Sequence, residues 1–437
     1  MPKKINLIKF LCLLVYLGCV SANTLHYQPQ QIHLSIGDEP NSIVVTWNTI
    51  DNPGKSMVEY GINGFILTAS GTRKLFVDGG KEKHSQWIHK VTLSDLEPDI
   101  KYIYHCGSNL GWSAEFFFKT FPDGNNWIPR IALFGDMGNE NIQSLPRLQE
   151  ETQRGLYDAI IHVGDFAYDM NSDNARVGDE FMNQIQSIAA YVPYMTCAGN
   201  HEESFNFSNY RARFNMPGQT DNMFYSFNMG PVHFIGFSSE VYYFMNYGIK
   251  SLVNQYEWLE KDLIEANKPE NRKERPWIVT FAHRPMYCSN ENGDDCTHYE
   301  TLVRSGLPFS EFFALEPLFY KYGVDLEFWA HEHSYERLWP IYDYKVYNGS
   351  YEEPYRNPRA PVHIITGSAG CKEGREPFIR KIPEWSAFHS QDYGYTQLYA
   401  HNSTHLELKQ ISVDKAGAVI DQFYVIKDEH GSYTKTD

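Results

Sequence analysis

The stretch that decides the fold runs from residue 159 to residue 168 and reads Ala-Ile-Ile-His-Val-Gly-Asp-Phe-Ala-Tyr. Its first half, Ala159–Val163, is a short apolar run, and a Gly-Asp turn follows at once. Short apolar runs that end in turn residues are typical of buried strands. The pattern therefore predicts a buried strand that carries polar side chains at its carboxyl end.

The same arrangement recurs along the chain. Further motifs that follow apolar runs are Gly135-Asp136-Met137-Gly138, Gly199-Asn200-His201-Glu202, Phe281-Ala282-His283-Arg284-Pro285 and Ala330-His331-Glu332-His333. Helical patterns separate the runs, most clearly at Gln255–Ala266 and Glu316–Tyr322. Strands that alternate with helices predict an α/β domain of layered sheets flanked by helices, which we place at residues 128–437, C-terminal strands included.

Residues 23–122 show a different pattern, in which short alternating strands are separated by turn residues. The clearest strand is Ser42–Trp47, and regular short strands of this kind favour a β-sandwich. The spacing Leu96-x-Pro98-x-x-x-Tyr102 resembles the tyrosine corner of fibronectin type III domains. We therefore expect an all-β, fibronectin type III-like domain with Trp47 in its core.

The first 22 residues have the layout of a signal peptide: a basic start, an apolar run from Phe10 to Val20 and a small-residue cleavage site. We expect a secreted protein without stable membrane insertion, and delivery to lysosomes stays open. Export agrees with sequons for N-glycans at Asn206, Asn348 and Asn402.

The formal net charge of −16 argues against binding to nucleic acid.

Five of the seven cysteines remain after removal of the signal peptide. Cys288 and Cys296 flank a polar loop and are the best disulfide candidates. Cys106, Cys197 and Cys371 cannot all pair within one chain, and Cys197 is expected to be a buried thiol. The unpaired cysteines and the sandwich allow a homodimer without requiring one.

The motifs supply oxygen and nitrogen ligands suited to metal ions of intermediate hardness. Loops at the carboxyl ends of strands in an α/β sheet converge on one crevice, so these side chains are expected to meet there. The order Asp, Asp-x-x-Tyr, Asn-His, His, His-x-His resembles the metallophosphoesterase superfamily. Tyr168, three residues after Asp165, points to its purple acid phosphatase branch, whose larger plant and animal members also carry a fibronectin-like domain.

The resemblance implies a phosphomonoester hydrolase with a dinuclear centre of Fe(III) and one divalent ion: zinc, iron or manganese. It implies that Asp136, Tyr168 and His333 hold Fe(III), that Asn200, His283 and His331 hold the divalent ion, and that Asp165 bridges the two. One departure is Ala330, where the family usually has glycine.

A hydroxide at the metal ions is the expected nucleophile, and the leaving alkoxide then needs a proton donor. His201, beside Asn200, is the first candidate for this catalytic role, and His298 is a second candidate for a contact with the small phosphate ester. Two other functions stay open: a phosphodiesterase or nucleotidase that uses two divalent ions, and a secreted binding protein with an inert phosphatase fold.

Overall fold

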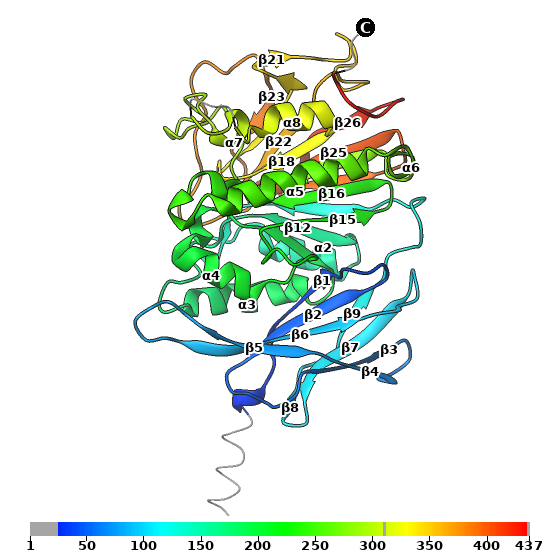
Figure 1. Ribbon diagram of the computed structural model, residues 1–437, viewed down its shortest axis with the longest axis vertical. Helices are drawn as coiled ribbons and strands as arrows, with labels where there is room; N and C mark the ends of the chain where they lie inside the picture. The colour runs from blue at the N-terminus through cyan, green and yellow to red at the C-terminus, as the bar shows by residue number, and fades with distance from the viewer. Residues whose placement is uncertain (1–24, 309–311, 435–437) are drawn as a thin grey trace, which may run out of the picture.

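The computed structural model describes residues 25–308 and 312–434, so the expected signal peptide lies outside the described residues. A sandwich of strands forms one end of the molecule, and larger sheets with flanking helices form the rest (Figure 1). The expected fold class, an all-β sandwich followed by an α/β domain of layered sheets, is confirmed.

The sandwich packs a four-stranded sheet against a five-stranded sheet. The first has the order β1 (Gln30–Ile36), β2 (Ile43–Thr49), β6 (Ser85–Leu93), β5 (Thr72–Val77), and the second β4 (Leu67–Ser70), β3 (Met57–Gly61), β7 (Lys101–Ser108), β8 (Gly111–Trp112), with β9 (Phe116–Lys119) on β7. Trp47 is buried in this core. The Tyr102 hydroxyl accepts a hydrogen bond from the Glu97 amide at 3.0 Å, which confirms the tyrosine corner.

Two larger sheets form the second domain and share one hydrophobic core. The six-stranded sheet has the order β14 (Tyr194–Cys197), β12 (Ala159–Val163), β10 (Arg130–Phe134), β24 (Gly394–Ala400), β25 (His405–Ser412), β26 (Ala418–Ile426). The seven-stranded sheet has the order β15 (Phe224–Met229), β16 (Val232–Phe237), β17 (Trp277–Phe281), β18 (Leu326–Trp329), β22 (Val362–Thr366), β19 (Tyr335–Leu338), β23 (Ser386–Ser390).

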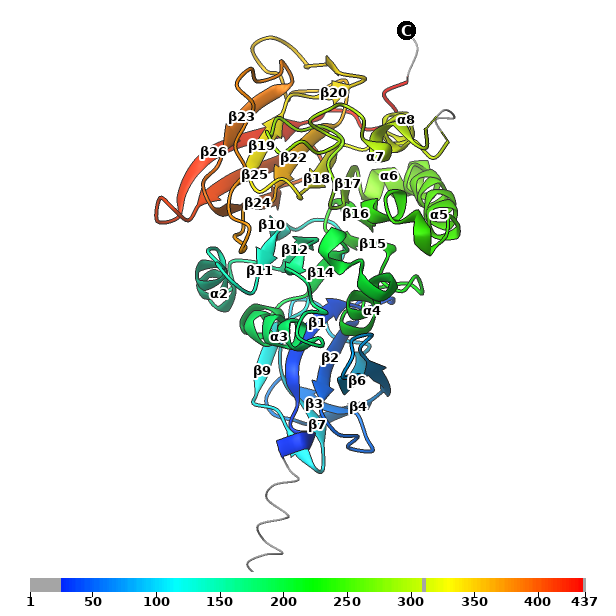
Figure 2. The ribbon, with the colours of Figure 1, turned by 90° about the vertical axis from the view of Figure 1, so that its left-hand side faces the viewer.

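Helices flank the two sheets on their outer sides (Figure 2). Beside the first sheet are α2 (Leu145–Gln153) and α3 (Arg176–Ala189), and beside the second are α5 (Lys250–Ala266), α6 (Pro269–Glu274) and α8 (Leu315–Tyr322). The remaining elements are short: α4 (Ser204–Arg213), α7 (Leu302–Ser305), β11 (Met137–Gly138), β13 (Phe166–Ala167), β20 (Ile341–Tyr342), β21 (Lys345–Val346), η1 (Leu25–Tyr27), η2 (Asn200–Glu202), η3 (Ser239–Tyr242) and η4 (Met245–Tyr247).

The helix α5 begins at Lys250, earlier than the Gln255 expected from the pattern. The added turn carries Leu252, which is fully buried and lies seven residues before buried Leu259. This spacing continues the apolar face of the helix, and the apolar contact accounts for the earlier start.

The parallel pairing of strands positions the motifs. Strands β10, β12 and β14 are parallel neighbours in the first sheet, and β17 and β18 are parallel neighbours in the second. Parallel strands end at the same edge of their sheet. The five predicted motifs therefore emerge at two sheet edges, and these edges touch, because the His331 amide donates to the Asp136 carboxylate at 2.9 Å.

Asp179 on α3 joins the two domains. Its carboxylate accepts hydrogen bonds from Gln31 at 3.2 Å and Gln86 at 2.9 Å, both in the sandwich, and lies 2.9 Å from His84. It also forms an ion pair of 2.6 Å with Arg213, whose side chain is only 1% exposed. One carboxylate thus satisfies a buried cation and fixes the sandwich to the second domain.

We expect Asp179→Ala to lower the free energy of unfolding by about 3 kcal/mol, because it leaves the buried guanidinium of Arg213 without its carboxylate. Urea unfolding followed by tryptophan fluorescence measures the change. Asp173→Ala is the matched control, since its side chain is 66% exposed and should cost less than about 0.5 kcal/mol. Equal losses in the two variants would contradict this role of Asp179.

Candidate metal centre

A first cluster of possible ligands forms where β10, β12 and β18 end. The Tyr168 hydroxyl lies 2.7 Å from His333 Nε2 and 3.2 Å from Asp136 Oδ1. His333 Nε2 and Asp136 Oδ1 are 3.5 Å apart. All three side chains are buried, and a carboxylate, a phenol and an imidazole converge on one small volume.

A second cluster forms beside it around His283, which follows β17. His283 Nε2 lies 3.1 Å from Asn200 Oδ1, 3.1 Å from Asp165 Oδ2 and 3.3 Å from His331 Nδ1. Candidate ligand atoms of Asp165, His283 and His331 all lie within 4.8 Å of one another. The structure thus gathers the seven residues predicted as metal ligands into two adjoining clusters.

The donor atoms fit two metal ions. Ligand atoms that share one ion at about 2.1 Å lie roughly 3 Å apart, which is the spacing observed in both clusters. Carboxylate and phenol oxygens in the first cluster are hard ligands, whereas the second offers an amide oxygen and two imidazoles to a softer ion. Burial raises the pKa of Tyr168 well above its usual value, and the charges of Asp136 and then Asp165 act in the same direction. Asp165 therefore lies close enough to influence both clusters.

Several of these residues have backbone angles that L-residues rarely adopt. The φ values are 58° at Asp136, 55° at Asp165, 54° at Tyr168 and 70° at His331. Each such conformation costs about 1–3 kcal/mol and persists only where surrounding contacts enforce it. Left-handed residues follow three different strands. They indicate a site in which the direction of the side chains is fixed at a cost in backbone strain.

Glu202 provides one of these enforcing contacts. Its buried carboxylate accepts hydrogen bonds from the amides of Asp165 at 3.0 Å, Phe166 at 2.9 Å and Gly199 at 2.9 Å. Glu202 therefore ties the loop after β12 to the loop after β14, a role that its position beside His201 in the sequence did not reveal.

Ala330, the departure from the family pattern, is accommodated without strain. It is fully buried and is not among the residues with positive φ; the left-handed residue is His331. Its methyl group occupies the space that a side chain at position 135 would need, and position 135 is glycine. The change therefore leaves the backbone that bears His331 intact.

His201 lies next to both clusters. Its Nδ1 is 2.8 Å from Asp169 Oδ1, and its Nε2 is 3.9 Å from Asp165 Oδ2 and 3.7 Å from Glu373 Oε1. Burial lowers the pKa of His201, but the carboxylates of Asp165 and Asp169 outweigh it and raise the pKa to about 9. The carboxylates around His201 thus favour its protonated form in the metal-free protein.

His298 does not join this group. It is exposed two residues after the loop closed by the disulfide, and within residues 25–308 and 312–434 its imidazole forms no hydrogen bond or ion pair with the residues of the clusters. The predicted disulfide between Cys288 and Cys296 is present, and Cys106, Cys197 and Cys371 are buried free thiols.

Four residues of the site escaped the sequence analysis. Asp169 orients His201, Glu373 faces its other nitrogen, Asp294 lies 2.5 Å from His331, and the Cys371 sulfur lies 3.7 Å from His333 Nδ1. Asp169 directly follows Tyr168, so its position beside a motif was a usable signal. The other three come from loops in which no periodicity or spacing marks them.

Comparisons with known proteins agree over most of the chain. The family profile of calcineurin-like phosphoesterases matches residues 129–335, that of the purple acid phosphatase N-terminal domain residues 29–120, and that of the iron/zinc purple acid phosphatase-like protein C residues 360–422. Acid phosphatase type 7 of Danio rerio is 59% identical, and that of Homo sapiens 53% identical, each over 92% of both chains.

A solved structure is similar as well. The purple acid phosphatase PPD1 from yellow lupin (Lupinus luteus) seeds is 26% identical, with a TM-score of 0.78 over 92% of this chain and 75% of that one. Along the described part of the chain, no helix combines the length and apolar character needed to cross a membrane.

We expect metal loading of the stripped protein to release protons at neutral pH. Burial lowers the pKa of both histidines, but the Asp165 carboxylate raises that of His283 to about 10 and the hydrogen bond to Asp136 raises that of His333 to about 12. A metal ion binds only the neutral imidazole, so each must lose its proton. Calorimetric titration in buffers of different ionisation enthalpy measures this release, and a heat that does not depend on the buffer would contradict it.

Proposed function

The chain belongs to the purple acid phosphatase family of calcineurin-like phosphoesterases, and from this membership we propose that it is an acid phosphatase that hydrolyses phosphomonoesters at a centre of Fe(III) and one divalent ion, either zinc, iron or manganese. One observation carries the proposal. Tyr168 lies in a buried cluster with Asp136 and His333, and a phenolate beside a carboxylate is a donor set suited to Fe(III).

The proposed ligands follow the two clusters. Asp136, Tyr168 and His333 hold Fe(III), and Asn200, His283 and His331 hold the divalent ion. Asp165 bridges the two, in keeping with its contact of 3.1 Å with His283 and its charge acting on Tyr168. A relative named Fe(3+)-Zn(2+) purple acid phosphatase 12, from Arabidopsis thaliana, is 30% identical over 86% of this chain and 80% of its own length, and its name supports this choice of ions.

When bound, the ions supply Lewis acidity to the phosphoryl group and lower the pKa of water at the centre. His201 is the proton donor to the leaving alkoxide. Its Nδ1 is held by Asp169, which directs Nε2 toward Asp165. Burial lowers the pKa of His201, but the charge of Asp165 and the hydrogen bond to Asp169 raise it to about 9, which favours the protonated form that a donor needs. His298, on the loop after Cys296, is assigned an outer contact with the substrate, which requires its exposed side chain to turn toward the site.

We assign the protein to the exported class, with secretion or lysosomal delivery as its destination. The disulfide between Cys288 and Cys296 supports an oxidising compartment. Asn402 is an exposed sequon whose side-chain oxygen accepts from the Thr404 amide at 2.8 Å, which leaves its nitrogen available for a glycan. Asn206 and Asn348 are only partly exposed, so Asn402 is the sequon best presented for modification.

A purified protein with iron should show a purple or pink visible band, because tyrosinate bound to Fe(III) absorbs in this region. Tyr168→Phe should abolish the band while the divalent ion is retained, as measured by absorption and metal analysis of one sample. A colourless wild-type protein with two divalent ions would overturn the ferric assignment and favour a phosphodiesterase-like centre. A colourless protein that neither binds added iron and zinc nor cleaves a phosphomonoester would favour an inert fold.

We expect His201→Ala to lower kcat by about 10²–10⁴-fold, the usual contribution of a positioned general acid. Metal content should be unchanged, because the proposed ligands do not include His201. Steady-state kinetics with a phosphomonoester of poor leaving group gives the test. A substrate with an activated, easily expelled leaving group is the control, since it needs no proton donor and should be affected far less. Unchanged turnover of the first substrate would remove His201 from the mechanism.

A further inference from the structure

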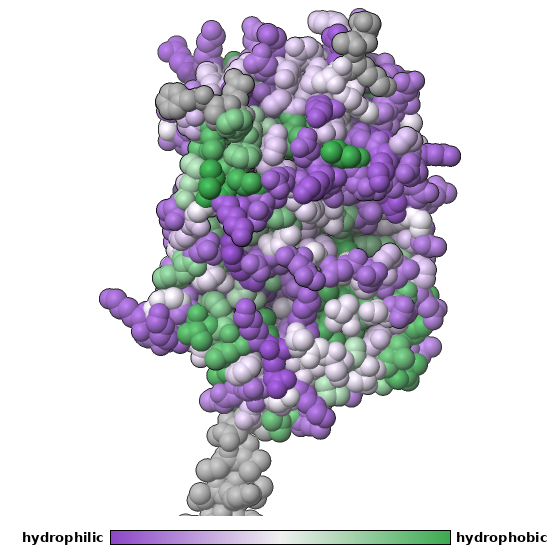
Figure 3. All heavy atoms as spheres, viewed as in Figure 1, coloured by the Kyte–Doolittle hydropathy of each residue, from purple (hydrophilic) through white to green (hydrophobic). Residues whose placement is uncertain are grey.

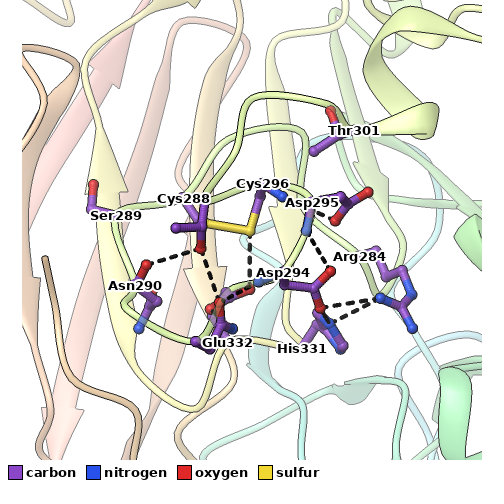
Figure 4. The surroundings of a disulfide bond; sticks show 12 residues. Arg284, Cys288, Ser289, Asn290, Asp294, Asp295, Cys296, Thr301, His331 and Glu332 are labelled. Atoms are coloured by element: carbon purple, nitrogen blue, oxygen red, sulfur yellow. Dashed lines mark hydrogen bonds and ion pairs between the residues drawn. A yellow bond between two sulfur atoms is a disulfide. The ribbon is translucent and has the colours of Figure 1, made fainter.

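The loop from Cys288 to Cys296 is packed against the histidine motif after β18 (Figure 4). The disulfide closes this loop, and both of its cysteines are buried. Cys296 Sγ lies 3.0 Å from one carboxylate oxygen of Glu332, and Asn292 donates to the other at 2.6 Å. Because Glu332 stands between His331 and His333 in the chain, the loop contacts the motif directly.

The same loop places one carboxylate on the outer side of His331. Asp294 Oδ2 lies 2.5 Å from His331 Nε2, whereas His331 Nδ1 faces His283 Nε2 at 3.3 Å. The two ring nitrogens therefore point in opposite directions, one into the second cluster and one to Asp294. Arg284 Nη1 also lies 3.1 Å from Nε2, but the shorter contact is with Asp294, whose Oδ2 can accept from both Arg284 and Nε2–H. A carboxylate that accepts from Nε2–H leaves the lone pair on Nδ1, the tautomer that a metal ion on that side requires.

Other contacts fix the Asp294 carboxylate in this place. Its Oδ1 accepts from the Asp295 amide at 2.6 Å, and its Oδ2 lies 3.3 Å from Arg284 Nη1. Arg284 is held in turn by fully buried Glu240 at 3.0 Å and by the face of the Tyr243 ring, 4.5 Å from the guanidinium carbon. A side chain held from both sides in this way has little freedom to leave His331.

We propose that Asp294 is a positioning residue that selects the tautomer and direction of His331, and that the Cys288–Cys296 disulfide keeps it there. The inference rests on the proposed function, in which His331 binds the divalent ion. Outer partners of this kind contribute about 10–100-fold to metal affinity. The effect should be confined to the divalent ion, because the contacts of His333 are with Tyr168, Asp136 and Cys371, away from Asp294.

Asp294→Ala should lower the affinity for zinc at the divalent site about 10–100-fold in competition with a chelator, with iron content and visible band retained. Asp294→Asn keeps an acceptor oxygen and should lose less. Asp295→Asn is the control on the same loop, since the Asp295 side chain contacts Tyr243 and the Cys296 amide and, within residues 25–308 and 312–434, contacts neither His331 nor His333. Zinc affinity equal to wild type in Asp294→Ala would overturn the proposal.

The role of the disulfide is tested with the double variant Cys288→Ser/Cys296→Ser, which frees the loop. It should lose zinc affinity in the same direction while the visible band persists. Loss of both ions together would show a general structural effect and overturn the claim about the disulfide. A wild-type protein without iron would contradict the proposed function instead, and the zinc measurements on Asp294→Ala would still decide the inference.

Discussion

The structure depends on two carboxylates that are buried where the edges of the two large sheets meet, because their charges require partners. Asp136 and Asp165 are no more than 1% exposed, and an unpaired buried charge is costly enough that partners must be supplied. Those partners are imidazoles from β17 and β18 in the opposite sheet. In the metal-free protein this charge balance holds the two sheets together at this edge, and the proposed metal ions would take over the role of the imidazole protons, since bound imidazoles are neutral.

The loops around these carboxylates adopt strained backbone because the side chains must face a single point. Glu202 links two of the loops through backbone amides, and Asp294 and Arg284 support His331 from outside. No sandwich residue that the structure describes contributes a side chain to the clusters. Its contact through Asp179 instead fixes α3, the helix that follows the loop of Tyr168 and Asp169.

The sequence predicted the strands and the clustered motifs because each motif directly follows an apolar run, and parallel strands bring such ends together. It could not predict Asp294, Glu373 or Cys371, since irregular loops carry them and no periodicity encodes the path of a loop. The helix α3 and the strand β15 were also missed; α3 begins after Ala175, an N-cap residue without a capping side chain, so the sequence carries no start signal there. His298 is the opposite case. The family resemblance suggested a contact with the substrate, but the side chain of His298 is exposed and lies outside the two clusters.

The close packing of Ala330 against Gly135 has an evolutionary consequence. Replacing Ala330 by glycine removes one methyl group and creates no steric overlap, so this substitution is sterically allowed. A side chain at position 135 would overlap Ala330, and even after that obstacle was gone it would lie 2.9 Å from the Val163 carbonyl oxygen. The two positions thus depend on each other unequally: glycine at 135 permits alanine or glycine at 330, while neither choice at 330 releases 135. Glycine at position 330 is therefore reachable in a single step, whereas a side chain at position 135 is excluded with either residue at 330.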